Sequence, residues 1–204
     1  MEIHTATFVS SHTDVTTCPP PNRHEYAFIG RSNVGKSSLI NMLTNHSKLA
    51  KTSSTPGKTQ LINHFLINDE WYLVDLPGYG YIKAAKTLRG QFSAMIRDYI
   101  LRRENMICLF VLVDSRHAPR EIDLEFMAWL GENGVPFVLV FTKMDKLSAR
   151  ESDTCVAEYE KVMLEQWEKM PLTFVTSAEN RLGRAELLAY LDELNRTVEN
   201  PAIG

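Results

Sequence analysis

The sequence predicts an α/β fold in three layers, with a mainly parallel sheet, one antiparallel edge hairpin and helices on both faces. Short runs rich in Val, Ile, Leu and Phe alternate with longer amphipathic stretches, which is the pattern of parallel strands joined by helices. Two of the runs are separated by only three residues, too few for a parallel crossover. The chain has 204 residues, of which 44% are hydrophobic, so we expect one domain over residues 1–204.

The apolar runs and the amphipathic stretches give the expected elements. The buried parallel strands are Tyr26–Ile29, Met106–Val113, Phe137–Phe141 and Leu172–Thr176. The antiparallel hairpin consists of Leu61–Ile67 and Trp71–Asp75. The helices are Ser37–Asn45, Thr87–Glu104, Arg120–Asn133, Ala149–Lys169 and Arg184–Thr197.

The first 22 residues are harder to assign. The stretch from Thr13 to Asn22 contains three consecutive prolines, which block both a helix and a central strand. Ile3–Val9 could therefore be an added edge strand or part of a loose N-terminal arm, and the sequence supports both alternatives equally.

Cysteine use and the apolar runs bear on where the protein works. The three cysteines are an odd number, lie far apart and form no Cys-x-x-Cys pair, which argues against a disulfide framework or a zinc site. The N-terminal residues lack the basic stretch and apolar core of a signal peptide, and the apolar runs are only strand-sized. We therefore expect a cytoplasmic monomer without a membrane segment.

A glycine-rich motif follows the first expected parallel strand and precedes the first expected helix. It reads Gly-Arg-Ser-Asn-Val-Gly-Lys-Ser and matches the pattern G-x-x-x-x-G-K-[ST]. Its backbone N–H groups can surround a phosphate chain, Lys36 can reach the β- and γ-phosphates, and the Ser37 hydroxyl can bind Mg²⁺. The sequence therefore predicts a P-loop NTPase whose loop binds nucleotide through Gly30, Arg31, Ser32, Asn33, Val34, Gly35, Lys36, Ser37 and Ser38.

A second motif, Asp75-Leu76-Pro77-Gly78, stands at the end of an expected strand. The Asp75 carboxylate can hold the magnesium ion through a water, and the Gly78 N–H can meet the γ-phosphate. Alone, this sequence is also a good turn. Downstream of a P-loop, it completes a phosphate and metal site in which Lys36 and Gly78 have catalytic roles.

The base is read by a third motif, Thr142-Lys143-Met144-Asp145, at the C-terminal end of another expected strand. Guanine offers two parallel donors that the Asp145 carboxylate can accept, whereas adenine would leave this carboxylate facing an acceptor. Lys143 would lay its aliphatic stem on the purine. A fourth element after the last strand, Thr176-Ser177-Ala178, would donate the Ala178 N–H to guanine O6. The four motifs together predict a GTPase.

With these motifs in order, the chain resembles the translation-factor-type small GTPases over nearly its whole length. The residues within the motifs narrow the resemblance to the EngB family, also called YihA or YsxC; they are Gly30–Asn41, Thr55–Gln60, Asp75–Tyr81 and Thr142–Lys146. The resemblance implies a bacterial GTPase that acts as a nucleotide-dependent switch in assembly of the large ribosomal subunit and is needed for normal cell division. Its partners would be GTP, GDP and the large subunit or its precursor.

The same resemblance places further nucleotide contacts at Pro56, Gly57, Lys58 and Thr59. Thr59 would close on magnesium and the γ-phosphate in the GTP state and take part in catalysis, although the residues alone allow Thr52 or Thr55 equally. Thr142 occupies the position of the usual asparagine. Its shorter side chain removes the amide contact to the base and the P-loop, which we expect to weaken affinity without changing the base that is read.

Catalysis depends on what replaces a missing residue. Many GTPases orient the attacking water with a glutamine directly after Asp-x-x-Gly, but this chain has Tyr79 there. A phenol cannot hold water as an amide does, so we expect slow turnover, with activation by a partner or by potassium. In related GTPases that use potassium, an asparagine at the position of Asn33 is a cation ligand. Asn33 could equally serve because it tolerates a left-handed backbone.

Basic residues are concentrated in the middle of the chain. Residues 31–103 hold eleven Lys/Arg against four Asp/Glu, a balance of +7, so the net charge of −3 leaves −10 for the rest. This basic region could neutralise RNA phosphates beside the nucleotide-sensing segments, or it could be an ordinary solvated surface. The residues concerned are Lys48, Lys51, Lys58, Lys83, Lys86, Arg89, Arg97, Arg102 and Arg103.

Aromatic residues and histidines complete the set of candidates. Tyr79, Tyr81 and Phe92 could stack on RNA bases, although the helical spacing of Phe92 with neighbouring apolar residues favours the core. Three histidines share no metal-binding spacing and are expected to be ordinary surface or loop residues: His46, His64 and His117.

Two other functions remain for comparison. A nucleoside monophosphate kinase shares the P-loop and the sheet, but it has no use for a carboxylate that reads guanine. A signalling or trafficking G protein with a protein partner is the main alternative. Such proteins usually carry a lipid anchor, and neither a terminal Cys motif nor an initial Met-Gly is present.

Overall fold

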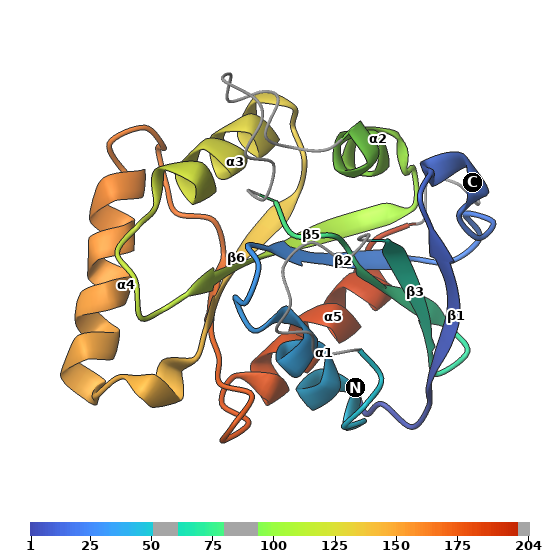
Figure 1. Cartoon of the computed structure of the whole chain (residues 1–204), viewed down its shortest axis with the longest axis horizontal. Helices are drawn as coiled ribbons and strands as arrows, with labels where there is room; N and C mark the ends of the chain where they lie inside the picture. Colours follow the sequence, from blue (N-terminus) through green and yellow to red (C-terminus); the bar gives the residue numbers. More distant parts are fainter. Residues whose placement is uncertain (51–60, 80–93, 200–204) are drawn as a thin grey trace.

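The structure is a computed structural model that describes residues 1–50, 61–79 and 94–199. Within these residues, seven strands form one sheet in the order β1-β3-β4-β2-β5-β6-β7 (Figure 1). The strands are β1 Ala6–His12, β2 Glu25–Gly30, β3 Ile62–Ile67, β4 Trp71–Asp75, β5 Met106–Asp114, β6 Phe137–Thr142 and β7 Thr173–Val175. The helices are α1 Lys36–Thr44, α2 Ala94–Arg102, α3 Glu121–Glu132, α4 Ala149–Met163 and α5 Arg184–Thr197, with short 3₁₀ turns at Val15–Thr17 and Met144–Lys146.

Five neighbouring strands of the sheet are parallel, and its β1–β3–β4 end is antiparallel. Strands β4, β2, β5, β6 and β7 pair in parallel, while β3 pairs antiparallel with β4. The β3–β4 turn has positive φ at Asn68 (51°) and Asp69 (58°), and the Glu70 N–H donates to Ile67 O at 2.9 Å. These features define the type I′ turn that suits the twist of a hairpin. The predicted α/β fold and its edge hairpin are therefore confirmed.

The N-terminal segment adds a seventh strand. Of the two alternatives for this segment, the structure contains the edge strand, which begins and ends about three residues later than expected. Strand β1 pairs antiparallel with β3, with a bulge between Phe8 and Ser10. The Asn68 side chain accepts hydrogen bonds from the backbone N–H groups of His4 and Thr5, at 2.7 and 3.1 Å, and so holds the start of the strand against the hairpin turn.

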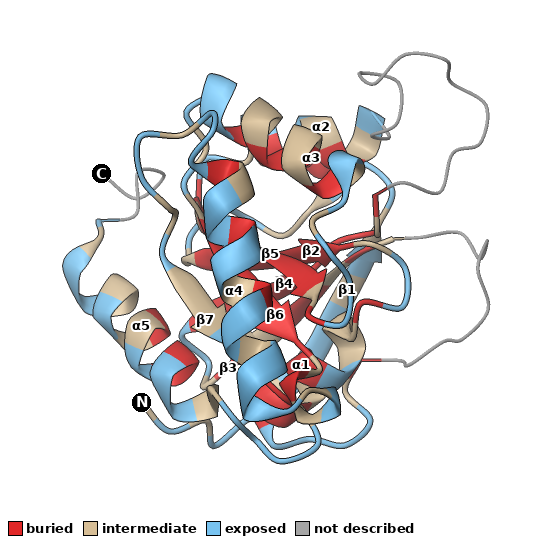
Figure 2. Ribbon diagram, turned by 90° about the vertical axis from the view of Figure 1, so that its left-hand side faces the viewer, coloured by how far each residue is buried: buried red, intermediate tan, exposed pale blue. Residues whose placement is uncertain are grey.

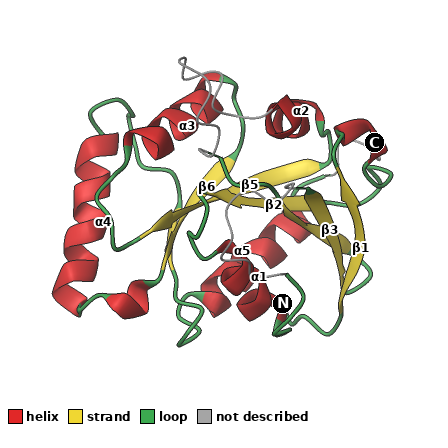
Figure 3. Cartoon of the chain, viewed as in Figure 1, coloured by secondary structure: helices red, strands yellow, loops and turns green. Residues whose placement is uncertain are grey.

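Helices cover both faces of the sheet. Helices α1 and α5 pack with one hydrophobic cluster, and α2, α3 and α4 pack with the other. Figure 2 shows the buried residues concentrated in the strands and on the inner sides of the helices, and Figure 3 shows the strands lying between the two helical layers. Among the described residues, none of the helices combines the length and apolar character needed to cross a membrane.

Two predicted helices differ from the structure. The helix expected over Ala149–Lys169 ends at Met163. After this point the Trp167 ring packs across α3, where a Cβ on Gly131 would come within 2.7 Å of it, and meets the Phe137 ring edge-on at 5.7 Å. This tertiary packing draws the chain away from the helix axis. The second helix was expected over Thr87–Glu104. Its residues 87–93 lie outside the described part of the chain, and helix α2 ends at Arg102, two residues earlier than expected.

Candidate functional site

The P-loop joins the end of β2 to the start of α1. Asn33 and Gly35 both have a left-handed backbone, with φ of 63° and 102°, and Lys36 is the first helical residue. A Cβ on Gly30 would lie 2.9 Å from Leu112 O, so only glycine fits between the strands here. The sequence therefore produces a loop whose backbone turns sharply into a helix N-terminus, which favours an anion.

The residues predicted to bind phosphate and metal meet at this helix. Asp75 is the last residue of β4 and is 8% exposed, and its carboxylate forms an ion pair with the Lys36 ammonium group. Ser37 follows Lys36 in the same first turn of α1. A carboxylate and a hydroxyl are ligands that suit Mg²⁺, and a neighbouring ammonium group suits phosphate.

The Gly78 loop packs directly on the P-loop. A Cβ on Gly78 would lie 3.0 Å from Gly30 O and 3.3 Å from Ser32 N, and Arg31 and Tyr79 form a parallel backbone bridge. The Leu76 side chain is fully buried in the core, so this residue could meet a nucleotide only through its backbone. Residues of the two motifs that are as many as 48 positions apart in sequence thus lie in backbone contact.

The motif predicted to read the base also contacts the P-loop. The Thr142 hydroxyl donates to Val34 O at 2.5 Å, and the Lys143 ammonium group donates to Asn33 O at 2.6 Å. Threonine has no amide to contact the loop, as expected, but its hydroxyl makes a contact that the sequence did not indicate: Thr142, 3% exposed at the end of β6, reaches a backbone carbonyl of the loop. The Lys143 stem crosses the loop within 3.5 Å of the Cβ position of Gly35.

Lys143 has an acidic partner that the sequence reasoning missed. Its ammonium group lies 3.0 Å from Asp114 Oδ2 at the end of β5, and Arg116 donates to the same carboxylate. Burial raises the pKa of Asp114, but hydrogen bonds from Arg116 and Lys143 outweigh this effect and hold that pKa well below its usual range. The available signal was an acidic residue at the carboxyl end of a parallel strand, next to the expected nucleotide loops.

Asp145 is held by two side chains. The Ser177 hydroxyl donates to Asp145 Oδ1 at 2.7 Å, and the Lys146 ammonium group lies 2.9 Å from Oδ2. The hydrogen bond from Ser177 and, to a smaller extent, the contact with Lys146 lower the pKa of Asp145, so the group is a carboxylate at neutral pH. Met144 N donates to Thr176 O at 3.1 Å, which ties the third motif to the fourth.

A cavity of about 530 Å³ lies beside these residues and extends to α1. The predicted site residues that line this cavity are Gly35, Ser38, Thr142, Lys143, Asp145, Thr176 and Ala178. The Met144 side chain instead belongs to the core and is 6% exposed. Pro56, Gly57, Lys58 and Thr59 lie outside the described residues. The remaining predicted residues gather at the carboxyl ends of β2, β4, β6 and β7.

Three expectations about individual side chains are wrong. Tyr79 is 2% exposed and therefore does not present a ring to RNA bases. His64 is fully buried, with Nε2 3.1 Å from Glu25 Oε1, and is not a surface residue. The Arg103 side chain is 7% exposed and donates to the same carboxylate, so it is not part of a free basic surface. Each of these three side chains is buried against a residue that is distant in sequence. Tyr81 and Phe92 lie outside the described residues.

The fold and the arrangement of the four motifs define a P-loop GTPase. A sequence model described as "50S ribosome-binding GTPase" matches residues 25–143. The "Probable GTP-binding protein EngB" of Phocaeicola vulgatus is 60% identical over 199 residues, covering 98% of this chain and 100% of the relative. That of Bacteroides fragilis is 57% identical over 200 residues, with the same coverage. The chain therefore belongs to the EngB family of GTP-binding proteins, within the ribosome-binding GTPases.

Solved structures share the fold at lower identity. The crystal structure of a probable GTP-binding protein engB has a TM-score of 0.62 and 23% identity, and covers 85% of this chain and 100% of that chain. The structure of Era in complex with MgGDPNP and nucleotides of 16S ribosomal RNA has a TM-score of 0.64 and 20% identity, covering 86% and 58%.

Proposed function

We propose that this protein is a single-domain, monomeric GTPase that binds GTP and GDP with Mg²⁺ and hydrolyses GTP slowly on its own. In the cytoplasm it would act as a nucleotide-dependent switch in assembly of the large ribosomal subunit and would be needed for normal cell division. The observation that carries the nucleotide assignment is the Asp145 carboxylate, fixed by Ser177 and Lys146 at the edge of a cavity of about 530 Å³.

Selection of guanine follows from the fixed carboxylate. Both Asp145 oxygens are acceptors, and guanine supplies two donors in parallel, whereas adenine supplies an acceptor at one of these positions. Since Ser177 already orients the carboxylate, little freedom is lost when the base binds. Ala178 also lines the cavity, where its N–H can donate to guanine O6.

The phosphates would lie over the P-loop at the start of α1. Backbone N–H groups of Gly30–Ser37, the Lys36 ammonium group and the Gly78 N–H would hold them. Ser37, Thr59 and, through a water, Asp75 would hold Mg²⁺. The side-chain oxygens of Ser37 and Asp75 suit this ion. Ser37 lies in the first turn of α1, and the Asp75 carboxylate contacts Lys36 in the same turn. When bound, the ion neutralises charge on the phosphates.

Turnover would be slow because the chain lacks a side chain that orients water at the position after Gly78. The Tyr79 phenol turns into the core and is committed to Asp123. The φ of 63° at Asn33 favours the explanation that asparagine is there for its backbone. A potassium ion bound by the Asn33 side chain is compatible with that backbone, and activation by a partner is the other route to faster hydrolysis.

The ribosomal role rests on the family and on exposed basic residues. Lys48 and Arg102 are exposed in the described part of the basic region. Lys51, Lys58, Lys83, Lys86 and Arg89 lie outside the described residues. Binding through phosphate contacts would weaken steeply as salt concentration rises.

The decisive experiment compares the two nucleotide states on ribosomal particles. The chain is loaded with a non-hydrolysable GTP analogue or with GDP, mixed with purified large subunits or their precursors, and sedimented. We expect cosedimentation of the GTP-state protein only, and loss of binding at moderate salt. Small subunits are the matched control. Equal binding in both nucleotide states, or equal binding to small subunits, would contradict the proposal.

A further inference from the structure

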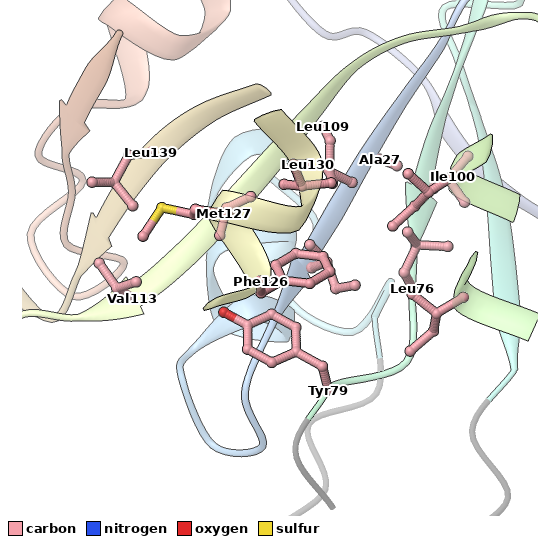
Figure 4. Packing of buried hydrophobic residues seen from close by; sticks show 14 of the residues in the cluster. Ala27, Leu76, Tyr79, Ile100, Leu109, Val113, Phe126, Met127, Leu130 and Leu139 are labelled. Atoms are coloured by element: carbon pink, nitrogen blue, oxygen red, sulfur yellow. The ribbon is translucent and has the colours of Figure 1, made fainter. Parts of the chain in front are cut away.

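The Tyr79 side chain turns away from the P-loop and into the core. Its ring stacks on Phe126 of α3, with ring centroids 4.3 Å apart and planes 27° apart. Its hydroxyl donates to Asp123 Oδ1 at 2.8 Å. Figure 4 shows the Tyr79 ring lying against Phe126, beside the apolar residues that α3 contributes to the core. Tyr79 therefore joins the Gly78 loop to α3 through a ring stack and a hydrogen bond.

The chemistry of this contact keeps it intact at neutral pH. Burial, followed by the charge of Asp123, raises the pKa of Tyr79 well above its usual range, so the phenol remains a donor. Asp123 is only 4% exposed, and a buried carboxylate that loses this donor would lose a hydrogen bond. Breaking the contact therefore costs free energy at both the Tyr79 hydroxyl and the Asp123 carboxylate.

The anchor acts on a backbone that already touches the P-loop. Gly78 precedes Tyr79, and its Cβ position lies 3.0 Å from Gly30 O. Tyr79 itself forms a parallel bridge with Arg31. The loop cannot move away from the P-loop without pulling the Tyr79 ring out of its stack.

We propose that Tyr79 is a positioning residue for GTP: its contacts with Asp123 and Phe126 hold the Gly78 N–H beside the P-loop before the nucleotide binds. This inference rests on the proposed function, in which the Gly78 N–H meets the γ-phosphate. GDP has no γ-phosphate and does not use this contact. The anchor thus increases affinity for GTP over GDP by removing an ordering cost, and it explains why the position holds a tyrosine when a water-orienting glutamine is absent.

The test measures the ratio of GTP-analogue affinity to GDP affinity in matched variants. Tyr79→Phe removes only the hydroxyl, and Asp123→Leu removes its acceptor. Ordering one residue of backbone costs about 1–2 kcal/mol, so we expect each variant to lower the ratio by about five- to thirtyfold with GDP affinity unchanged. Asp123→Asn keeps an acceptor oxygen and should retain a ratio close to that of the natural chain.

Tyr26→Phe is the control for a merely structural effect. Tyr26 is also fully buried, and its hydroxyl donates to Asn195 Oδ1 at 2.8 Å on the opposite face of the sheet. This variant should lose comparable thermal stability and keep the natural ratio. An unchanged or increased ratio in Tyr79→Phe, or equal weakening of both nucleotides, would overturn the inference. Failure of the proposed function would instead appear in the natural chain, as absence of guanine-nucleotide binding.

Discussion

Acid should destabilise this protein through one buried carboxylate. Glu25, at the start of β2, is fully buried. Arg103 Nε and Nη2 donate to its two oxygens at 3.0 and 2.6 Å, the Tyr99 hydroxyl donates at 2.7 Å, and His64 Nε2 lies at 3.1 Å. Burial raises the pKa of Glu25, but hydrogen bonds with His64 and Arg103 outweigh it and lower the pKa to about 2.

The size and direction of the effect follow from this pKa. The folded-state pKa of Glu25 lies below the ordinary value of 4.5, so its contribution is fully present above pH 4.5 and is lost as the pH falls towards 2. The difference corresponds to a contribution of about 3 kcal/mol to the free energy of unfolding. Since small domains have a total of about 5–15 kcal/mol, this share is large.

Glu25→Gln tests the argument, because the amide leaves Arg103 without a charge partner. At pH 7 we expect the free energy of unfolding to fall by about 3–5 kcal/mol. Between pH 5 and pH 3 the gap to the natural chain should narrow, since only the natural chain loses this carboxylate. The assay is urea unfolding of the nucleotide-free protein followed by circular dichroism. The exposed Glu165→Gln is the matched control, and a gap that stays constant with pH would refute the reasoning.

Three further predictions concern the nucleotide site. Asp145→Asn should lower GTP affinity by about two orders of magnitude or more and favour xanthosine triphosphate, because an amide presents one donor and one acceptor; unchanged GTP binding in a titration would contradict the base assignment. Lys36→Ala should abolish nucleotide binding, and normal binding in the same titration would rule out the P-loop assignment. If the Asn33 side chain binds potassium, GTP turnover should rise in potassium over sodium chloride and lose this response in Asn33→Ala, whereas equal slow rates in both salts would leave only activation by a partner.

Local patterns predicted most of the fold. Strands such as β6 are continuous apolar runs because both their faces are buried, and that signal depends on no distant contact. Ends of elements were less predictable. The end of α4 depends on the packing of Trp167 between Gly131 of α3 and Phe137 of β6, and packing between elements leaves no periodic signal in the sequence.

Polar residues in the core show where sequence reasoning stops. His64 and Arg103 look like surface residues in the sequence, and their shared partner Glu25 offsets the cost of burying them. The same holds for Tyr79, whose acceptor lies 44 residues away. The four nucleotide motifs were predictable because their chemistry is encoded in short segments, and the parallel strands bring those segments to one edge of the sheet.

The residues that flank segment 51–60 are held by polar contacts. Before it, Ala50 N donates to Asn41 Oδ1 at 2.8 Å, and Asn41 Nδ2 donates to Ala50 O at 3.1 Å. After it, His64 on β3 contacts Glu25 on β2. The described residues on both sides of this segment, which contains the proposed magnesium-binding threonine, are therefore attached to elements of the core.

Segment 80–93 is flanked in the same way. Tyr79 precedes it and is bonded to Asp123, while Tyr99 on α2 follows it and donates to Glu25 at 2.7 Å. The Glu25 carboxylate contacts His64 on β3, which follows the first segment, and Tyr99 on α2, which follows the second, so it links both elements to the P-loop strand β2.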